Sequence, residues 1–253
     1  MTLTPTMLLI VCPLALLAGF IDSIAGGGGM ISLPAYYLAG LSPALASGTN
    51  KLSAMMGTAL ATRNFAHAGK LDWGIGIPAA IGALLCSAVG ALVMVALPPR
   101  VVQVLVLTCI PIAAVFTLRG RKGTAQAKER TPQATRAIAL AIGCGVGFYD
   151  GLIGPGTGTF LILFFLQLFA MDAVRASGTA KLVNLASNVA ALVSLILTGD
   201  VLFLLGLPAG LCAMLGAALG SRLTIRRGGA VVRVVMLVVL GLLLAKMLMD
   251  VLG

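Results

Sequence analysis

Charge is scarce in this sequence. Of its 253 residues, 60% are hydrophobic and only 9% are charged, with 7 acidic side chains against 17 basic ones, and the mean hydropathy is +1.11. A soluble domain of this composition could not cover its surface with polar groups. A net charge of +10 would suggest nucleic acid in a soluble chain, but here the basic residues cluster in short loops between apolar stretches. We therefore expect a chain that lies in a lipid bilayer and binds no nucleic acid.

Residue sets for catalysis and metal binding are missing as well. The sequence has a single histidine, His67, and no Ser-His or Cys-His set, metal-ligand cluster or paired carboxylate motif. No Gly-Lys-Ser/Thr ending follows a strand, so its glycine runs are not nucleotide-binding loops. The cysteines are odd in number, lack ligand spacing and are interpreted as packing residues: Cys12, Cys86, Cys109, Cys144 and Cys212. We expect neither an enzyme nor a bound cofactor or metal.

Long apolar stretches recur along the whole chain. About 20 apolar residues span the hydrocarbon core of a bilayer. Stretches of about that length lie at 7–25, 44–61, 73–97, 101–118, 137–153, 174–198, 201–219 and 231–251. The first has no Lys or Arg before it and no convincing cleavage site after it, so we interpret it as retained membrane structure, not a secretory signal. The sequence thus predicts an all-α polytopic membrane protein with about eight hydrophobic spans.

The two halves of the chain repeat each other. Gly19-Phe20-Ile21-Asp22, followed by glycines at 26–29, returns as Gly147-Phe148-Tyr149-Asp150, followed by Gly154-Pro155-Gly156. Ser47-Gly48-Thr49-Asn50-Lys51-Leu52 returns as Ser177-Gly178-Thr179-Ala180-Lys181-Leu182. So many matches in the same order indicate the duplication of one unit. We predict a first transmembrane repeat at 1–118, a basic linker at 119–136 and a second repeat at 137–253.

Basic residues indicate how the chain is oriented. In the linker, Glu129 is the only charge that opposes Arg119, Arg121, Lys122, Lys128, Arg130 and Arg136. Loops rich in Lys and Arg stay in the cytoplasm, so we expect the linker there. The loops at 63–70 and at Arg175, and the segment 222–227, then fall inside, whereas Gly40, Arg100 and Gly199 fall outside. Both termini are predicted to be external.

This orientation requires each half to begin with a hairpin. The segments 7–41 and 137–171 must each enter and leave the membrane on one face, bent at their glycines, and three transmembrane helices follow each hairpin. Each half then crosses the membrane an odd number of times, so the two halves are inverted repeats, an architecture common among secondary transporters. The alternative treats each glycine break as a kink in one long helix, which gives a parallel repeat and leaves Arg222, Arg226 and Arg227 outside.

The candidate site is defined by the two glycine breaks and by four charged residues in apolar stretches, which are Asp22, Lys51, Asp150 and Lys181. Irregular backbone at mid-membrane is tolerated only where it is buried in protein or lines a cavity, and the N-terminus of the short helix after each break attracts anions. A bare charge at this depth costs roughly 2.5–3.5 kcal/mol, so the charged side chains need partners or a wet cavity. The predicted substrate-binding residues are Gly26, Gly27, Gly28, Gly29, Thr49, Asn50, Lys51, Gly154, Gly156, Thr157, Thr179, Lys181, Asn184 and Asn188.

Lysines surrounded by neutral hydrogen-bond donors suit a small oxyanion better than a cation or a sugar. Asp22 and Asp150 have two possible roles at such a site: holding the hairpin backbone, or carrying a proton in coupled transport. The alternative is a purely structural ion pair, for example Asp22 with Lys51 or Lys181. The sequence therefore predicts a secondary transporter of small anions that works by alternating access around a midplane site. An anion channel, or a membrane subunit of a larger assembly, is the alternative.

With these motifs in place, the chain resembles the sulfite exporter TauE/SafE family of membrane proteins, and within it the YfcA-like branch. The resemblance rests on residues 18–29, on Thr49-Asn50-Lys51-Leu52, on 147–151 with Gly154-Pro155, and on Ala180-Lys181-Leu182 with Asn184. It implies a bacterial inner-membrane transporter of small sulfur-containing anions such as sulfite or organosulfonates. The residues alone suggest an oxyanion; only the resemblance suggests sulfur.

Overall fold

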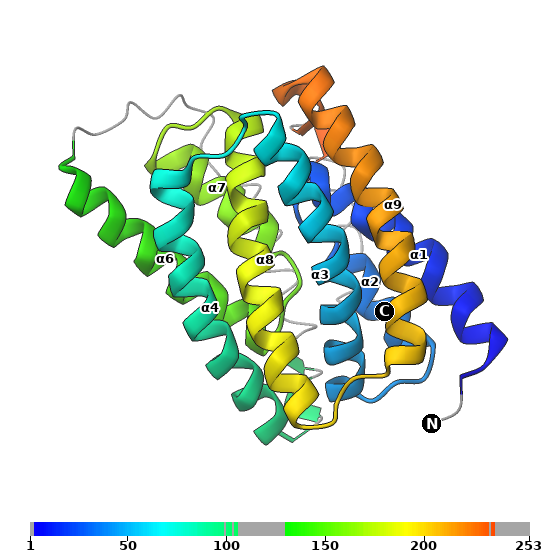
Figure 1. The fold of residues 1–253 in the computed structure, drawn as a ribbon. Coiled ribbons are helices and arrows are strands. Elements are labelled where there is room, and N and C mark those ends of the chain that lie inside the picture. Colours follow the sequence, from blue (N-terminus) through cyan, green and yellow to red (C-terminus); the bar gives the residue numbers. More distant parts are fainter. Residues whose placement is uncertain (1–2, 99, 103, 106–129, 233, 236–253) are drawn as a thin grey trace, which may run out of the picture.

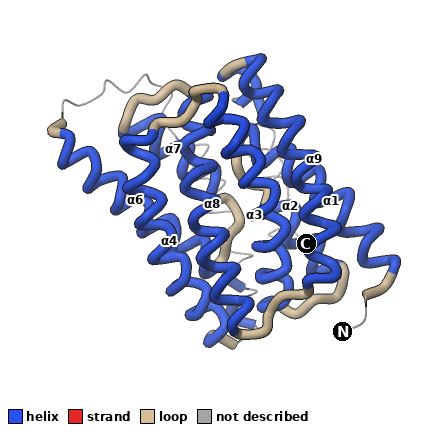
Figure 2. The backbone as a smooth tube through the Cα atoms, viewed as in Figure 1, coloured by secondary structure: helices blue, strands red, loops and turns tan. Residues whose placement is uncertain are grey.

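The computed structural model describes residues 3–98, 100–102, 104–105, 130–232 and 234–235. Within these ranges every regular element is a helix (Figure 2). The helices are α1 (Pro5–Ala25), α2 (Gly29–Leu38), α3 (Pro43–His67), α4 (Trp73–Ala96), α6 (Pro132–Leu152), α7 (Thr157–Leu168), α8 (Ala173–Leu197) and α9 (Phe203–Arg227). The first residues of the predicted linker that the structure describes, from Arg130, lead directly into α6.

Four of the described helices are long and apolar enough to cross a membrane: α1, α4, α8 and α9. The predicted spans at 44–61 and 137–153 also fall on long helices, α3 and α6, but these carry more polar side chains. Most of the predicted spans at 101–118 and 231–251, and the C-terminus, lie outside the described residues. The described chain thus has the length and composition of a multi-pass membrane protein.

Local sequence signals set where the helices begin. Pro5, Pro43 and Pro132 each occupy a first helical position, where the missing N–H costs nothing. Asp72 caps α4 by accepting a hydrogen bond from the Ile75 amide at 3.2 Å, and Asp172 caps α8 in the same way. Such caps satisfy backbone donors that a helix leaves unpaired.

Each glycine break turns the chain into a hairpin. Gly26 and Gly27, between α1 and α2, have φ values of 75° and 85°, and Gly154 and Gly156, between α6 and α7, have 91° and 89°. Only glycine adopts such angles readily. The Arg130 guanidinium before α6 donates to the Leu168 carbonyl at the end of α7, at 2.8 Å, so the second hairpin leaves at the end where it enters. Figure 1 shows the first hairpin doing the same at the opposite end.

At the centre of the molecule, α3 and α8 pack side by side and run antiparallel (Figure 1). The Asp72 amide, after α3, donates to Thr179 Oγ1 near the start of α8, at 3.0 Å. The Leu202 amide, after α8, donates to Thr49 Oγ1 near the start of α3, also at 3.0 Å. These are the same contact shifted by one repeat, so the two equivalent threonines have equivalent roles in the two halves.

In each half, the last helix that the structure describes with its bounds packs on the other half. Helix α9 packs chiefly on α1 and α3, and α4 packs chiefly on α6 and α8. On this packing we define a first bundle (α1, α2, α3 and α9), on the right of Figure 1, and a second bundle (α4, α6, α7 and α8), on its left. The packing therefore divides the chain differently from the duplication.

Glycines allow this helix exchange, by which we mean the packing of α9 on the first half and of α4 on the second. One of these glycines leads to a prediction. A Cβ at Gly143 would collide with the Ala79 backbone, whereas a Cβ at Gly145 on the same helix would meet no atom within 4 Å. We expect Gly143→Ala to force α4 and α6 apart and to lower the melting temperature in detergent by several degrees. Gly145→Ala is the matched control and should melt like the parent. Equal melting of the two variants would contradict the close packing of α4 on α6.

Candidate functional site

The two glycine breaks meet inside the molecule. Gly26 touches the backbone of Gly158 and Thr159, and a Cβ at Gly29 would lie 3.5 Å from Pro155 Cα. The N-termini of α2 and α7 therefore lie close together, one from each half. Free N–H groups at a helix N-terminus, together with the helix dipole, favour an anion.

Two ion pairs cross between the halves beside these breaks. Lys51 Nζ on α3 lies 2.7 Å from Asp150 Oδ2 on α6, and Lys181 Nζ on α8 lies 2.7 Å from Asp22 Oδ2 on α1. The pairs are equivalent under the repeat. Of the two partners that the sequence suggested for Asp22, the structure selects Lys181. The four charges cancel, so none of them is buried without a partner, which would be the costliest arrangement.

The two carboxylates differ in their other partners. Asp150 accepts hydrogen bonds from Thr157 Oγ1 at 2.7 Å and from Ser187 Oγ at 2.6 Å. Asp22 accepts one from the Gly28 amide at 3.2 Å. The Asp150 side chain is 3% exposed and that of Asp22 is 19% exposed. Asp150 therefore keeps two hydroxyl donors even if Lys51 moves away, whereas Asp22 has more contact with the cavity.

A cavity of about 50 Å³ lies at this junction. A single water needs roughly 10–15 Å³ by this measure, so the cavity has room for several waters or for one small ion. Twelve of the predicted site residues line it: Asp22, Gly27, Gly28, Gly29, Asn50, Lys51, Asp150, Gly154, Gly156, Thr157, Asn184 and Asn188. The cavity thus brings together both glycine breaks, both aspartates and one lysine.

The two lysines have different surroundings. Lys51 lines the cavity, and its ammonium also donates to Asn188 Oδ1 at 3.2 Å. Lys181 is 0% exposed and does not line the cavity. Asn50 Oδ1 is buried without a hydrogen-bond partner at the cavity wall. One lysine and one unsatisfied amide thus face the space where a ligand could lie, while the second lysine is covered by protein.

Four predicted site residues lie outside the cavity lining. They are Gly26, Thr49, Thr179 and Lys181. Gly26 is covered by the second glycine break, and the hydroxyls of Thr49 and Thr179 bind the loops that follow α8 and α3. The structure therefore gives the two threonines a role in holding loops.

Sequence reasoning did not include several residues that line the cavity. They are Ala15, Ala18, Gly19, Ser32, Ser53, Ala54, Gly57, Thr58, Gly158 and Ala213. A signal existed for Thr58, because it is the repeat partner of Asn188. Ala15 on α1 and Ala213 on α9 gave no such signal, since their place depends on how helices of different halves pack. Among the described residues, no group of three or more His, Cys, Asp or Glu side chains could hold a metal ion.

Comparison with known sequences shows the family to which the chain belongs. The sequence model of the family described as "Sulfite exporter TauE/SafE" matches residues 11–247. The chain belongs to the TauE/SafE family. The resemblance inferred from the sequence is thereby confirmed, and the chain is a membrane transporter, not an enzyme.

Relatives in this family match over nearly their full length. The probable membrane transporter protein YfcA of Escherichia coli is 37% identical over 98% of this chain and 91% of its own. The probable membrane transporter protein ORF9 of a Sinorhizobium species is 36% identical over 93% of this chain and 90% of its own. A probable membrane transporter protein of Haemophilus influenzae is 32% identical over 92% and 91%. No solved structure matches the chain.

Proposed function

We propose that this TauE/SafE protein is a secondary transporter of small anions, and that sulfur-containing oxyanions such as sulfite and organosulfonates are its substrates. The observation that carries the proposal is the cavity, where the Lys51 ammonium and the amides of Asn50 and Asn188 lie beside the N-termini of α2 and α7. Lys51 supplies a positive charge and the two helix N-termini supply N–H donors to one small space, while the free Asn50 Oδ1 can accept a hydrogen bond from a protonated oxyanion. Sulfur as the central atom is supported by the family description alone.

Binding must compete with an existing ion pair, because Lys51 is already paired with Asp150. An incoming oxyanion can take the place of Asp150 on the Lys51 ammonium while Thr157 and Ser187 continue to donate to the carboxylate. A proton on Asp150 would remove the remaining repulsion between the carboxylate and the anion. Asp150, and Asp22 across the cavity, are therefore the candidate coupling groups for transport with protons.

We further propose that the halves are inverted repeats and that transport occurs by alternating access around the cavity. The antiparallel α3 and α8, and the repeat-related contacts of Thr49 and Thr179, support a two-fold axis in the membrane plane. The sequence has no nucleotide-binding loop, so the energy would come from the gradient of the substrate or of a coupled ion.

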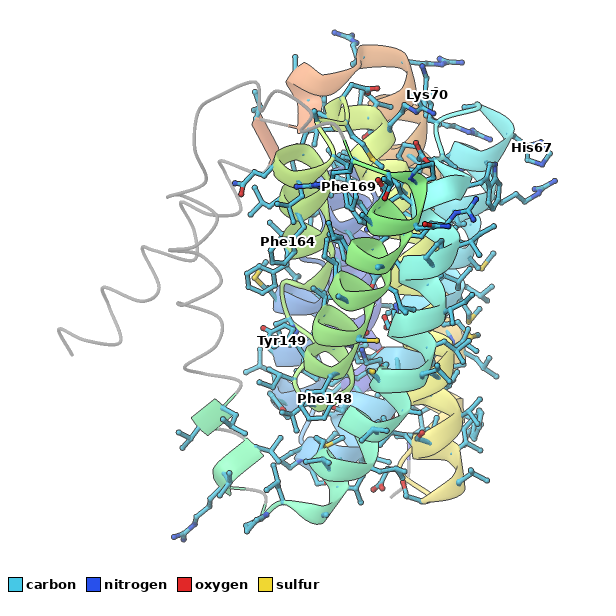
Figure 3. The ribbon with its side chains drawn as sticks, turned by 90° about the vertical axis from the view of Figure 1, so that its left-hand side faces the viewer. His67, Lys70, Phe148, Tyr149, Phe164 and Phe169 are labelled. Carbon is cyan, nitrogen blue, oxygen red and sulfur yellow. The ribbon has the colours of Figure 1, made fainter. Side chains whose placement is uncertain are left out.

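The position of basic side chains supports an orientation in a bacterial plasma membrane. Figure 3 labels His67 and Lys70 at one end of the molecule, and Arg130 binds the end of α7 at that same end. Arg226 and Arg227 end α9 there as well, as Figure 1 shows. This end would face the cytoplasm, and the N-terminus, Gly40 and Gly199 would be external.

This orientation makes a prediction for cysteines placed at Gly40 and Gly199 in a cysteine-free chain. Both should react with a membrane-impermeant maleimide in intact cells, and a cysteine at Lys70 should react only after lysis. Protection of the cysteine at Gly40 together with labelling at Gly199 would contradict the hairpin and with it the inverted repeat.

The direct test of the function is flux of labelled sulfite, sulfate and a short alkanesulfonate into proteoliposomes, with and without an imposed proton gradient. We expect saturable flux that is stimulated by unlabelled anion on the opposite side. A rate that does not saturate and shows no such exchange would indicate the alternative, an anion channel. Correctly folded protein that carries none of the three would count against the proposal and favour a membrane subunit that needs a partner.

A further inference from the structure

We propose that the first bundle and the second bundle, not the two sequence halves, move against each other in transport, and that the two ion pairs hold these bundles together. Each such ion pair is called a latch below. The inference rests on the proposed transport function and specifies its mechanics. Both pairs cross the bundle boundary, since Asp22 and Lys51 belong to the first bundle and Asp150 and Lys181 to the second. An anion bound at Lys51 would compete with Asp150 and so open one latch.

Contacts within each bundle join backbone to backbone. In the first bundle, a Cβ at Gly19 would collide with the Ala213 carbonyl, and one at Gly216 would collide with the Leu16 carbonyl. In the second bundle, Gly143 and Gly147 approach the backbone of Ala79 and Ala83 in the same way. Helices packed this closely have no room to slide past one another. Each bundle therefore has the packing of a rigid body, although each contains helices from both halves.

Across the boundary near the cavity, the glycine breaks also pack backbone to backbone, Gly26 against Gly158 and Thr159, but the contacts around them are polar. Besides the ion pairs, they include the Ser177 hydroxyl donating to the Ile24 carbonyl at 2.9 Å and the Thr159 hydroxyl donating to the Ala25 carbonyl at 3.2 Å. Water or an anion can replace such polar contacts. At the end where α3 begins, an apolar cluster with Ala46, Met94 and Leu195 joins the bundles, and it would have to separate when the boundary opens there.

Two short loops connect the bundles within the described chain. One joins α3 to α4 and contains Gly69, with φ 65°; the other joins α8 to α9 and contains Gly199, with φ 81°. No atom lies within 4 Å of the position where either glycine would carry a Cβ. The hydroxyls of Thr49 and Thr179 bind the ends of these loops. Each loop is thus held at its end, where Lys70 packs on Gly178 and Asp200 on Gly48, and is open around its own glycine, as expected of a hinge.

Native cysteines offer a test that separates the two kinds of moving body. The side chains of Cys12 on α1 and Cys212 on α9 contact each other, as do those of Cys86 on α4 and Cys144 on α6. Each pair joins opposite sequence halves but lies within one bundle. Joining the partners should stop transport if the halves move against each other, and should leave it intact if the bundles move.

The experiment uses dibromobimane, which bridges two nearby thiols through thioethers and becomes fluorescent when both have reacted. Thioethers are needed because sulfite cleaves disulfides. One variant keeps only Cys12 and Cys212, and another only Cys86 and Cys144, with the remaining cysteines, Cys109 included, changed to alanine. We expect bridging to change the flux by less than about twofold in both variants. A loss of more than about tenfold in either one would overturn the inference.

Two controls complete the flux test. Cys212→Ala in the first variant shows the effect of reagent on Cys12 alone. Ile24→Cys with Ser177→Cys in a cysteine-free chain places a bridge across the boundary, between residues that are already in contact. Bridging this pair should abolish flux, and retained flux in the bridged protein would overturn the inference.

A measurement without substrate keeps the inference separate from the transport function. Spin labels at exposed Leu9 on α1 and Leu215 on α9 lie in one bundle but in different halves, whereas labels at Leu9 and Leu85 on α4 lie in one half but in different bundles. In the variant Lys51→Met with Asp150→Asn, which opens a latch, the distance distribution of the second pair should broaden and that of the first should not. The reverse pattern, or no change in either pair, would overturn the inference even if flux is normal.

Discussion

Asp22→Asn is expected to lower the free energy of unfolding by about 3–5 kcal/mol, the usual cost of breaking a buried ion pair by removing one partner. The reason is Lys181, whose side chain is 0% exposed and whose ammonium has Asp22 Oδ2 as its carboxylate partner at 2.7 Å. Asparagine keeps the size and the hydrogen-bonding capacity of the side chain but not its charge, so a full positive charge stays buried. Thermal and denaturant unfolding in detergent would measure the loss.

The matched control removes both charges at once. Asp22→Asn with Lys181→Met leaves no uncompensated charge, and replacing a whole buried pair is often close to neutral. We therefore expect the double variant to recover most of the lost stability. A double variant less stable than Asp22→Asn alone would contradict the ion pair as the source of the effect.

The second large effect concerns binding. Lys51→Met with Asp150→Asn removes the pair that lines the cavity, and we expect it to fold but to bind sulfite about tenfold to hundredfold more weakly, since a hydrogen bond to a charged group is worth about 1.5–3 kcal/mol. A calorimetric titration of the purified protein with sulfite measures the affinity. Flux into proteoliposomes should fall together with this affinity.

The double variant of the other pair is the comparison that decides the interpretation. Lys181 does not line the cavity, and Asp22, which does, is a carboxylate that does not attract an anion, so Asp22→Asn with Lys181→Met should not weaken sulfite binding by more than a few-fold even if its flux changes. Equal loss of affinity in the two double variants would mean that the lysines share the substrate, as the sequence alone suggested.

The sequence predicted the composition of the site better than its geometry. Repeated motifs placed a lysine, an aspartate and a glycine break in each half, and the glycine runs predicted both hairpins because four glycines in succession, or a proline between two, cannot continue a helix. Symmetry of sequence also suggested that Lys51 and Lys181 have equal roles. The structure separates them, because the residues around each lysine differ: Asn50 corresponds to Ala180, and Thr58 to Asn188.

The helix exchange could not be foreseen from sequence patterns. Periodicity shows which stretches are helical, but helices in a bilayer are apolar on nearly every face, so the pattern does not indicate the partner of each. Glycines such as Gly19 and Gly216 suggested close packing without saying against what. Only the structure shows that the partner of α1 is α9 and that the partner of α6 is α4.

This exchange has a consequence for biosynthesis. Helix α1 leaves the ribosome before the other helices that the structure describes, and its main partner, α9, is the last of them. Until α9 is made, only lipid or another chain can cover the face of α1 that contains Gly19. Asp22 likewise has no ion-pair partner until Lys181 on α8 has been synthesised. The site is therefore completed late, and a chain cut within α9 should be removed by quality control even though every charged residue of the cavity has already been synthesised.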